Sequence, residues 1–399
     1  MKKRIFIAIH YMEIGGAERS LLGLLNAIDT SQYGVDLFVY SHHGDFMPLI
    51  PDKINLLPEL RKYSTIELPL IEVAKKGYID IVIARLLAKI ACREFMKREG
   101  KTEGSSIFQY VADYTTPLLP RIRGYYDLAI SFLTPHNIVL DKVQAKRKIA
   151  WIHTDYSTIQ VNRDLELKVW GKYDYIASIS DKVSETFLKT FPELKKKIVL
   201  IENILSPVFV RDQADSEDVS SEIHKNDDVI NLCSVGRFSD AKNFDNLPWI
   251  CRKILESGIA VRWYIVGYGG MESLIREQID KAGVKENVIL LGKKTNPYPY
   301  IKACDIYVQP SRYEGKAVTV REAQMLCKPV VITDFPTAHS QLTNGTDGLI
   351  VPMDNEEAAA GIAAFIRDKE LQNHFISNMK RTDYGNEDEV EKIYRLIAE

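Results

Sequence analysis

The chain has 399 residues, of which 46% are hydrophobic and 27% charged, and its formal net charge is −2. This length exceeds one ordinary hydrophobic core, so roughly two or three domains are expected in a globular protein. The near-neutral charge provides no global basic field and argues against nucleic acid as a partner. The five scattered cysteines form no CxxC pair, which excludes a disulfide framework and a cysteine zinc site and predicts buried free thiols in a reducing cytosol.

The N-terminus predicts a buried strand, not a targeting segment. An apolar run at 5–9 follows Met-Lys-Lys-Arg, and His10 and Glu13 interrupt it earlier than the apolar region of a signal peptide allows. No stretch reaches the ~18 apolar residues of a membrane-spanning helix. We therefore expect a cytoplasmic protein.

The first part of the chain alternates short apolar runs with helical patterns. Strands are expected at 4–9, 35–40, 128–131, 148–152 and 175–178, and helices at 21–28 and along the stretch 71–98. This alternation predicts a mostly parallel sheet that is covered by helices on both faces.

The long helical stretch is locally basic. Residues 75–101 hold eight Lys or Arg and three acidic residues, together with aliphatic side chains at roughly helical spacing. The plainer interpretation is an amphipathic helix packed on its own domain with a solvated basic face. The alternative is a helix that contacts the anionic inner membrane surface.

A change in composition divides the chain. Residues 211–228 are rich in Asp, Glu and Ser and offer little to bury, which predicts a solvated loop or linker. The alternation then restarts, with strands expected at 229–235, 261–266, 288–291, 306–309, 330–332 and 348–351 and helices at 244–255, 271–282, 320–326 and 356–368. The expected organisation is a first α/β domain at 1–205, an acidic linker at 206–228 and a second α/β domain at 229–384.

Two cations follow the first strand of the second domain. Gly236 ends that strand, and Arg237 and Lys242 lie five residues apart in the loop toward the next helix. In open parallel sheets, ligands bind beyond the carboxyl ends of the strands. A guanidinium and an ammonium at this point could stabilise the charge that develops on a diphosphate leaving group. Two solvated loop cations are the alternative interpretation.

Two carboxylates follow a later strand of the same domain. Gly315 allows close approach of the backbone to a ligand, and a helix that starts near 317–319 would offer free N–H groups to an anion. Glu314 precedes this helix start and Glu322 lies inside the helix. The pair could hold the two ends of one elongated ligand by accepting hydrogen bonds from sugar hydroxyls. Helix-dipole partners or a solvated face are the alternative.

Further glycines end neighbouring strands of the second domain. Gly267 belongs to a Gly-Tyr-Gly-Gly segment that resembles a phosphate-binding loop, although such a pattern is weak and a tight turn explains it equally well. Gly292 and Lys293 follow the strand at 288–291 on the same rim and could line a pocket for a base.

The first domain offers fewer candidates. Gly16 follows the first strand and opens a helix, where it would permit close approach of a phosphate or sugar across a cleft between the domains. His153, with Asp155 nearby, ends another strand and could bond a sugar hydroxyl or transfer a proton. His136 and Asn137 are weaker candidates on an acceptor side. A turn glycine and structural histidines are the alternatives.

Several patterns are missing from the sequence. No Asp-x-Asp follows a clear strand, and no HExxH, GxSxG, GxxxxGK[ST] or strand-linked GxGxxG occurs. We therefore expect no metal site and no nicotinamide cofactor.

Five segments carry a resemblance to a known family, namely GGAERSLL, WIHTD, VGRFSDAKN, IVGYGG and EGKAVTVREA. Together they resemble a retaining GT-B glycosyltransferase of family 4, the glycosyl transferases group 1 type, over nearly the whole chain and most strongly from 229 to 355. The resemblance implies two Rossmann-like, doubly wound parallel-sheet domains facing a central cleft. It also implies that the last helix, at 385–399, crosses back to the first domain.

The resemblance implies an activity as well. A sugar would pass from a nucleotide-diphosphate sugar, most often a UDP-sugar, to a saccharide or lipid-linked acceptor in cell-surface polysaccharide synthesis. The reaction would need no metal or other cofactor and would take place at the inner membrane face. A sugar-nucleotide epimerase of the same fold and a non-catalytic nucleotide-sugar-binding protein are the alternatives.

Residue roles follow from the resemblance. Arg237 and Lys242 would hold the donor diphosphate, and Glu314 and His153 would contact the donor sugar, so these four form the expected catalytic set. Glu322 would bind the ribose. The remaining expected donor-binding residues are Gly16, Gly236, Gly267, Gly292, Lys293, Gly315, Lys316, Ala317 and Val318. Lys316 stands where many members carry an aromatic or aliphatic residue, which leaves the identity of the sugar open.

Overall fold

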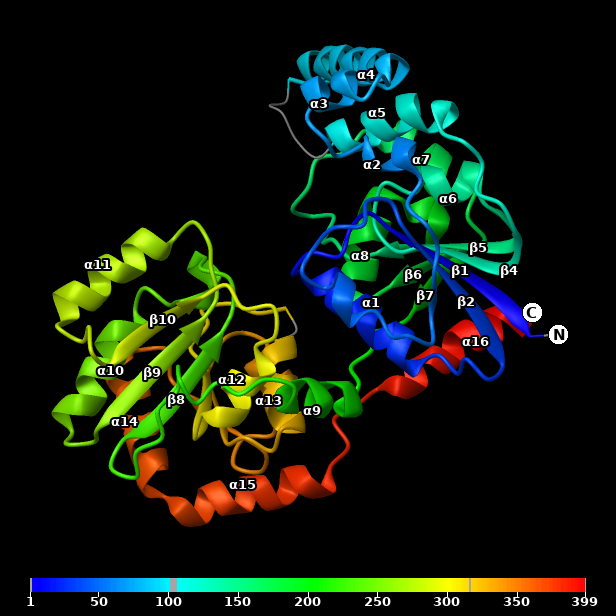
Figure 1. The fold of residues 1–399 in the computed structure, drawn as a ribbon. Coiled ribbons are helices and arrows are strands. Elements are labelled where there is room, and N and C mark those ends of the chain that lie inside the picture. The colour runs from blue at the N-terminus through cyan, green and yellow to red at the C-terminus, as the bar shows by residue number, and fades with distance from the viewer. Residues whose placement is uncertain (1, 101–105, 316, 399) are drawn as a thin grey trace. The chain divides into compact units, whose positions relative to one another are not determined.

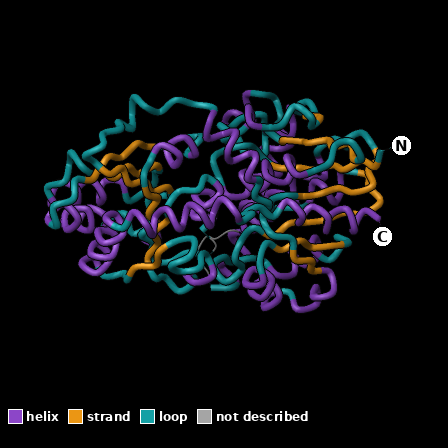
Figure 2. Tube along the Cα trace, turned by 90° about the horizontal axis from the view of Figure 1, so that it is seen from below, coloured by secondary structure: helices purple, strands orange, loops and turns teal. Residues whose placement is uncertain are grey.

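Apolar strands and the helices between them form two parallel sheets in the computed structural model, which describes residues 2–100, 106–315 and 317–398 (Figure 1). Each sheet belongs to its own compact unit. Unit 1 comprises Met1–Leu205 with Asn386–Glu399, and unit 2 comprises Ser206–Gly385. In both units the strands lie between helices (Figure 2), so the α/β class predicted from the sequence is confirmed.

Unit 1 holds a sheet of seven parallel strands in the order β3-β2-β1-β4-β5-β6-β7. The strands are β1 (Lys3–Ile9), β2 (Tyr33–Val39), β3 (Asn55–Leu56), β4 (Tyr125–Ser131), β5 (Gln144–Ile152), β6 (Tyr175–Ser178) and β7 (Ile198–Leu200). The helices are α1 (Gly16–Ala27), α2 (Arg61–Ser64), α3 (Leu70–Lys75), α4 (Ile79–Arg98), α5 (Ser106–Thr115), α6 (Asn137–Lys142), α7 (Arg163–Trp170), α8 (Asp181–Thr190) and α16 (Val390–Ala398). The interior strands are continuous apolar runs because helices cover both faces of the sheet.

The single helical stretch expected at 71–98 is two helices. Gly77 lies between α3 and α4 with a φ of +82°, a left-handed conformation that ends a helix and favours glycine. The apolar periodicity on either side of Gly77 hid this break.

The end of the chain packs in unit 1. The ring of Tyr394 on α16 stacks on Tyr33 at a centroid distance of 4.2 Å, and its hydroxyl accepts a hydrogen bond from the Asp29 N–H at 2.8 Å. The Asn386 side chain accepts a bond from the Leu205 N–H at 2.8 Å. These contacts attach the last helix to the first sheet's unit.

Unit 2 holds a sheet of six parallel strands in the order β10-β9-β8-β11-β12-β13. The strands are β8 (Ile230–Val235), β9 (Val261–Val266), β10 (Val288–Gly292), β11 (Ile306–Gln309), β12 (Val330–Thr333) and β13 (Leu349–Val351). The helices are α9 (Pro207–Asp215), α10 (Leu247–Glu256), α11 (Glu272–Ala282), α12 (Tyr298–Ala303), α13 (Val318–Met325), α14 (Asn355–Arg367) and α15 (Lys369–Arg381).

The acidic segment expected to be a linker is instead folded onto unit 2. Ser206 caps α9 by accepting a bond from the Phe209 N–H, and Pro207 occupies the first turn, where a missing N–H is harmless. Val210 and Ala214 on α9 are buried, as are Val219 and Ile223 beyond it. The acidic composition concealed this apolar spacing.

The cysteines are unpaired in the structure. All five cysteines are free; Cys327 is partly exposed and the other four are buried. Within the described residues, no helix is long and apolar enough to cross a membrane.

Candidate functional site

The sheet of unit 2 reverses its winding between β8 and β11. The chain runs from β8 outward through β9 and β10, and then returns to β11 on the other side of β8. Loops diverge at such a point and leave a crevice beyond the carboxyl ends of the two strands. The loop after β8 carries residues 236–242 and the loop after β11 carries residues 310–315. The Arg312 N–H joins the two loops by donating to the Ala241 carbonyl at 2.8 Å.

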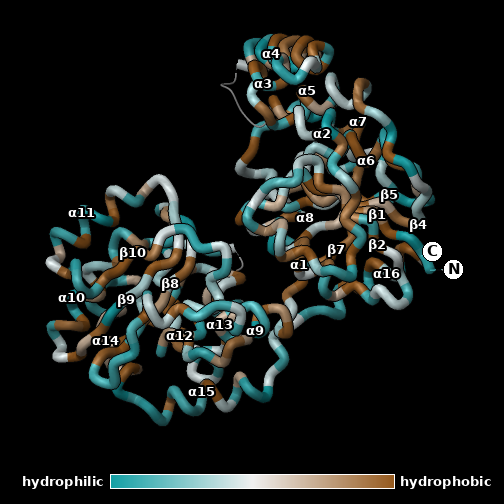
Figure 3. The backbone as a smooth tube through the Cα atoms, in the orientation of Figure 1, coloured by the Kyte–Doolittle hydropathy of each residue, from teal (hydrophilic) through white to brown (hydrophobic). Residues whose placement is uncertain are grey.

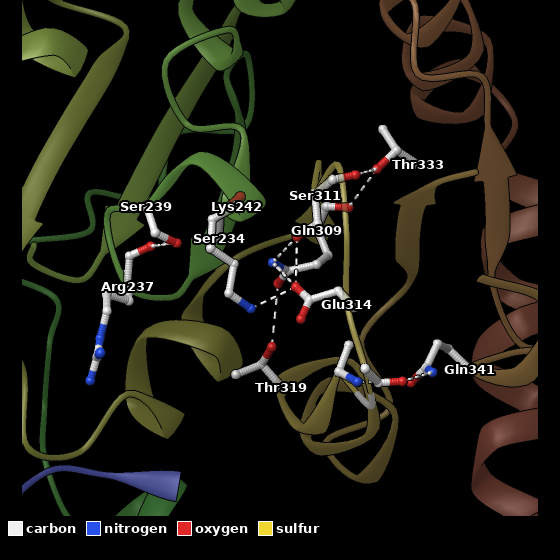
Figure 4. Close-up of polar contacts among 12 residues, drawn as sticks. Ser234, Arg237, Ser239, Lys242, Gln309, Ser311, Glu314, Thr319, Thr333 and Gln341 are labelled. Carbon is white, nitrogen blue, oxygen red and sulfur yellow. Dashed lines mark hydrogen bonds and ion pairs between the residues drawn. The ribbon is translucent and has the colours of Figure 1, made fainter. Parts of the chain in front are cut away.

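Lys242 and Glu314 meet between these two loops. The Lys242 Nζ donates to Glu314 Oε1 at 2.6 Å, and both side chains are largely buried (Figure 4). The methylene stem of Lys242 passes over Gly236, where a Cβ would crowd it. An ammonium and a carboxylate removed from water depend on each other, because either one alone would be a buried unpaired charge.

A polar network holds the Glu314 carboxylate in place. The Ser311 Oγ donates to Glu314 Oε1 at 2.6 Å, and the Gln309 Nε2 donates to the same oxygen at 3.2 Å. The Thr337 Oγ1 donates to the Glu314 carbonyl at 2.7 Å. Among the described residues, every hydrogen bond to this carboxylate reaches Oε1, so Oε2 is the oxygen that can accept from a ligand hydroxyl.

Arg312 fastens the same two loops from the other side. Its guanidinium donates to both carboxylate oxygens of Asp245, at 2.9 and 2.8 Å, and to the Asp240 carbonyl at 2.7 Å. The hydrogen bonds to Asp245 raise the pKa of Arg312. A planar guanidinium suits this two-oxygen contact better than an ammonium would.

Arg237 does not join the pair. Its side chain is exposed and points away from Lys242 and Glu314 in Figure 4. The two cations expected to act together are therefore on the same loop but do not converge in this structure.

The three predicted glycines of unit 2 lie side by side at the ends of β8, β9 and β10. The Gly236 N–H donates to the Val266 carbonyl at 3.0 Å, and the Gly267 N–H donates to the Gly292 carbonyl at 2.9 Å. A Cβ at Gly267 would overlap the carbonyl oxygen of Gly236, so close packing of the loops requires glycine there. The Lys293 ammonium, on the same rim, lies 5.5 Å from the centroid of the Tyr268 ring.

The helix after Glu314 begins where the sequence predicts, and one N–H at its start is already bonded. α13 starts at Val318, and the Ala317 N–H already donates to Gln341 Oε1 at 2.9 Å. Gly315 is exposed, and Lys316 lies outside the described residues. An anion that uses the Ala317 N–H would have to replace the Gln341 contact.

Glu322 is fully buried on α13. Its carboxylate accepts a hydrogen bond from the Tyr298 hydroxyl of α12 at 2.8 Å. The expected ribose contact therefore requires that this carboxylate be uncovered. The structure thus brings Glu314 and Lys242 together, whereas Glu322 is buried in the core of unit 2. The role of Glu322 in binding the ribose stays a prediction.

In unit 1, Gly15 and Gly16 play different parts. A Cβ at Gly15 would overlap the Glu18 carboxylate, whereas a Cβ at Gly16 would meet nothing within 4 Å. Burial raises the pKa of Glu18. Internal packing explains Gly15, and the open space at Gly16, the first residue of α1, is compatible with the expected close approach of a ligand.

His153 lines a pocket of about 350 Å³ at the carboxyl ends of the unit 1 strands. Its ring lies 4.6 Å from that of Phe132, and its buried Nε2 has no partner among the described residues. Burial lowers the pKa of His153 to about 3. The imidazole is therefore neutral near pH 7 and can bond a hydroxyl, but it does not supply a proton there. His10 and Glu67 line the same pocket, with the His10 Nδ1 2.8 Å from Glu67 Oε1.

The weaker candidates of unit 1 are structural. His136 is buried, bonded to the Ser131 hydroxyl at 2.8 Å, and packed against Trp170. Asn137 accepts a bond from Gln109. Asp155 caps its own turn by accepting from the Ser157 N–H at 2.9 Å.

Sequence reasoning missed the residues that position the pair. Gln309, Ser311 and Arg312 lie shortly before Glu314 in the sequence, whereas Asp245 reaches this loop only through the fold. A Ser-x-x-Glu spacing after a buried strand was the one signal for the Ser311 contact. Among the described residues, no group of three or more His, Cys, Asp or Glu could hold a metal ion.

Comparisons with known proteins find a family model that matches most of unit 2. Residues 215–382 match the family described as glycosyl transferases group 1. A lipopolysaccharide core biosynthesis mannosyltransferase of Rhizobium meliloti is 34% identical over 99 residues, which cover 24% of this chain and 28% of that protein. An N-acetylgalactosamine-N,N'-diacetylbacillosaminyl-diphospho-undecaprenol 4-alpha-N-acetylgalactosaminyltransferase of Campylobacter jejuni is 26% identical over 222 residues, which cover 55% of this chain and 58% of that protein. The matched stretches thus span from about a quarter to less than two thirds of these relatives.

The whole fold has solved counterparts. A TarM variant of S. aureus, in complex with fondaparinux, α-GlcNAc-glycerol and UDP, matches 100% of both chains with a TM-score of 0.65 and 14% identity. Two parallel α/β units of this topology define the GT-B fold class, as the sequence predicted. Within unit 2, residues 215–382 are similar to the glycosyl transferases group 1 family.

Proposed function

We propose that this protein is a retaining glycosyltransferase that moves a sugar from a nucleotide-diphosphate sugar to a saccharide or lipid-linked acceptor. The buried Lys242–Glu314 pair at the switch point of a group 1 domain is the observation that carries the proposal. The names of the relatives, which act in lipopolysaccharide core synthesis and on a diphospho-undecaprenol-linked sugar, support an acceptor of the cell-surface type.

The chemistry assigned to the pair is charge stabilisation and orientation. As the bond between the sugar C1 and the diphosphate oxygen breaks, negative charge grows on the leaving diphosphate, and the Lys242 ammonium stabilises it. The acceptor oxygen bonds to C1 on the face that the diphosphate leaves. The acceptor proton passes to an oxygen of that diphosphate. Glu314 Oε2 accepts from donor-sugar hydroxyls and orients the ring.

Metal independence and UDP are parts of the same proposal. Lys242 and, once it turns toward the diphosphate, Arg237 provide fixed cations where other enzymes use a metal ion. UDP is favoured because it is bound in the similar TarM structure. We propose that the acceptor is met at the inner membrane face.

A panel of UDP-, GDP- and ADP-sugars in a thermal-shift assay with EDTA tests donor binding. One donor at about 100 times its Kd should stabilise the fold by about 2.7 kcal/mol. That donor should then be hydrolysed slowly without metal, and the released sugar should keep its anomeric configuration in NMR spectra. Binding without turnover would favour a non-catalytic protein, and a donor converted to its epimer would favour an epimerase. No stabilisation by any nucleotide sugar would overturn the proposal.

A further inference from the structure

The outer face of α4 is apolar although it does not pack on the protein. α4 contacts α5 through its opposite side, where Ile81, Ala84, Ala88, Cys92 and Met96 are all buried. The outer face of α4, as defined here, consists of Ile79, Ile83, Leu86, Leu87 and Ile90, each between 46% and 53% exposed. In Figures 1 and 3, α4 lies at the margin of unit 1, beyond α5 as seen from the sheet.

The spacing of these five residues makes them one surface. They follow one another at i, i+4, i+7, i+8 and i+11, which at about 100° per residue places them on one side of the helix. The buried residues lie on the opposite side. A helix on a globular protein normally has one apolar stripe, whereas α4 has two. Isolated exposed aliphatic residues are ordinary, but a contiguous group of this kind marks an interaction surface.

Basic side chains surround the outer face of α4. Lys89, Arg93, Lys97 and Arg98 of α4 are exposed, and so are Lys75 and Lys76 just before it. Three acids lie nearby: Asp80 is paired with Lys62, Glu99 is paired with Arg98, and Glu94 is exposed on α4, so the cations outnumber the acids. On the neighbouring helix α3, Ile71 is 71% exposed. The combination of a contiguous aliphatic surface with a cationic border is complementary to an anionic lipid bilayer.

We infer that the outer face of α4 inserts into an anionic lipid bilayer, with its aliphatic side chains among the acyl chains and the bordering Lys and Arg at lipid phosphates. A second copy of this chain is the less suitable partner, because a two-fold contact would bring the two basic borders together. This inference rests on the proposed function and extends it. A glycosyltransferase that is bound to the bilayer would meet a lipid-linked acceptor there.

Vesicle flotation of the full-length protein tests the inference. Vesicles of phosphatidylglycerol and phosphatidylcholine should bind it, pure phosphatidylcholine vesicles should bind it much less, and salt should weaken the binding. Ile83→Ser/Ile90→Ser should lower the partition constant at least about tenfold, since two aliphatic side chains no longer enter the bilayer. Lys89→Glu/Arg93→Glu should lower it for anionic vesicles and reduce its salt dependence.

Leu274→Ser is the matched control, because Leu274 is an exposed aliphatic residue on α11 of unit 2 and should leave vesicle binding unchanged. Melting temperatures of all variants check that they fold, and donor binding measured without vesicles reports on the proposed function separately. Equal binding to neutral and anionic vesicles, or equal binding by the serine variant and the unaltered protein, would overturn the inference. So would a lack of vesicle binding together with a dimer that Ile83→Ser/Ile90→Ser dissociates. A failed donor assay with intact vesicle binding would contradict the proposed function only.

Discussion

At the scale of single residues, the Lys242–Glu314 pair serves both stability and chemistry, and substitutions can separate the two. Lys242→Met leaves the Glu314 carboxylate buried without its cation, so we expect unfolding to require about 3–5 kcal/mol less. The donor turnover rate should fall by about 10²–10³ because the leaving diphosphate loses a fixed charge. Urea denaturation and donor hydrolysis measure the two effects.

The double variant Lys242→Met/Glu314→Gln is the control for that experiment. It removes both charges and should recover most of the stability while turnover stays low. Arg237→Met should leave stability unchanged, because Arg237 is exposed, and should weaken donor binding. Turnover restored together with stability in the double variant would contradict the role of the pair.

His153 makes a separate prediction about pH. Its pKa is about 3 in the folded protein, against an ordinary value of 6.5, because burial disfavours the charged ring. Between these values the unfolded chain takes up a proton that the folded protein excludes, so this contribution to stability is complete above about pH 6.5 and is lost as pH falls toward 3. His153→Gln should reduce the slope of the unfolding free energy by up to about 1.4 kcal/mol per pH unit in this range.

The measurement is a series of urea denaturations between pH 7 and pH 4.5. His339→Gln is a suitable control, since the His339 side chain is 73% exposed. An unaltered pH slope in His153→Gln would show that the ring is not held neutral by burial.

At the scale of elements, the loops that follow the strands of unit 2 pack closely. As a result, Gly267 and Gly270, three residues apart, should respond differently to substitution by alanine. Gly267→Ala places a methyl group on the Gly236 carbonyl and should destabilise unit 2 by about 1–3 kcal/mol and weaken donor binding. Gly270→Ala meets open space and should do neither. Thermal melting with and without the donor distinguishes them, and equal behaviour of both variants would be the contrary result.

The strands of both sheets could be predicted because buried parallel strands are continuous apolar runs. The loops that carry Lys242 and Glu314 could be predicted for the same reason, since they follow such runs. What joins the loops could not: Arg312 and Asp245 are 67 residues apart in sequence, and only the winding of the sheet brings them into contact. The burial of Glu322 was hidden likewise, because Tyr298 reaches it from another helix.

At the scale of the whole molecule, the acidic segment at 206–228 belongs to unit 2. The second unit therefore begins at Ser206 and not at residue 229, as its composition suggested. The side chains of this segment reach across unit 2: Glu222 bonds Lys294 at 2.6 Å and the Tyr300 hydroxyl at 2.6 Å. The Gln213 carbonyl accepts from the buried Asn296 side chain at 2.7 Å. Asn296 and Tyr300 lie at α12, and Tyr298 of the same helix donates a hydrogen bond to Glu322. The segment therefore helps to hold α12 in place against α13, which carries Glu322.

Two fragments test this boundary. A chain of residues 206–385 should fold cooperatively and bind the donor nucleotide, because it contains the whole of unit 2. A chain of residues 229–385 lacks α9, exposes the apolar surface that Val210, Ala214 and Ile223 cover, and leaves Asn296 without the Gln213 contact. Burying three such side chains contributes several kcal/mol, so the shorter fragment should melt at a clearly lower temperature, or not fold, and lose nucleotide binding. Differential scanning calorimetry with UDP added decides between the two boundaries, since equal melting and equal UDP stabilisation would mean that residues 206–228 are the solvated linker their composition suggests.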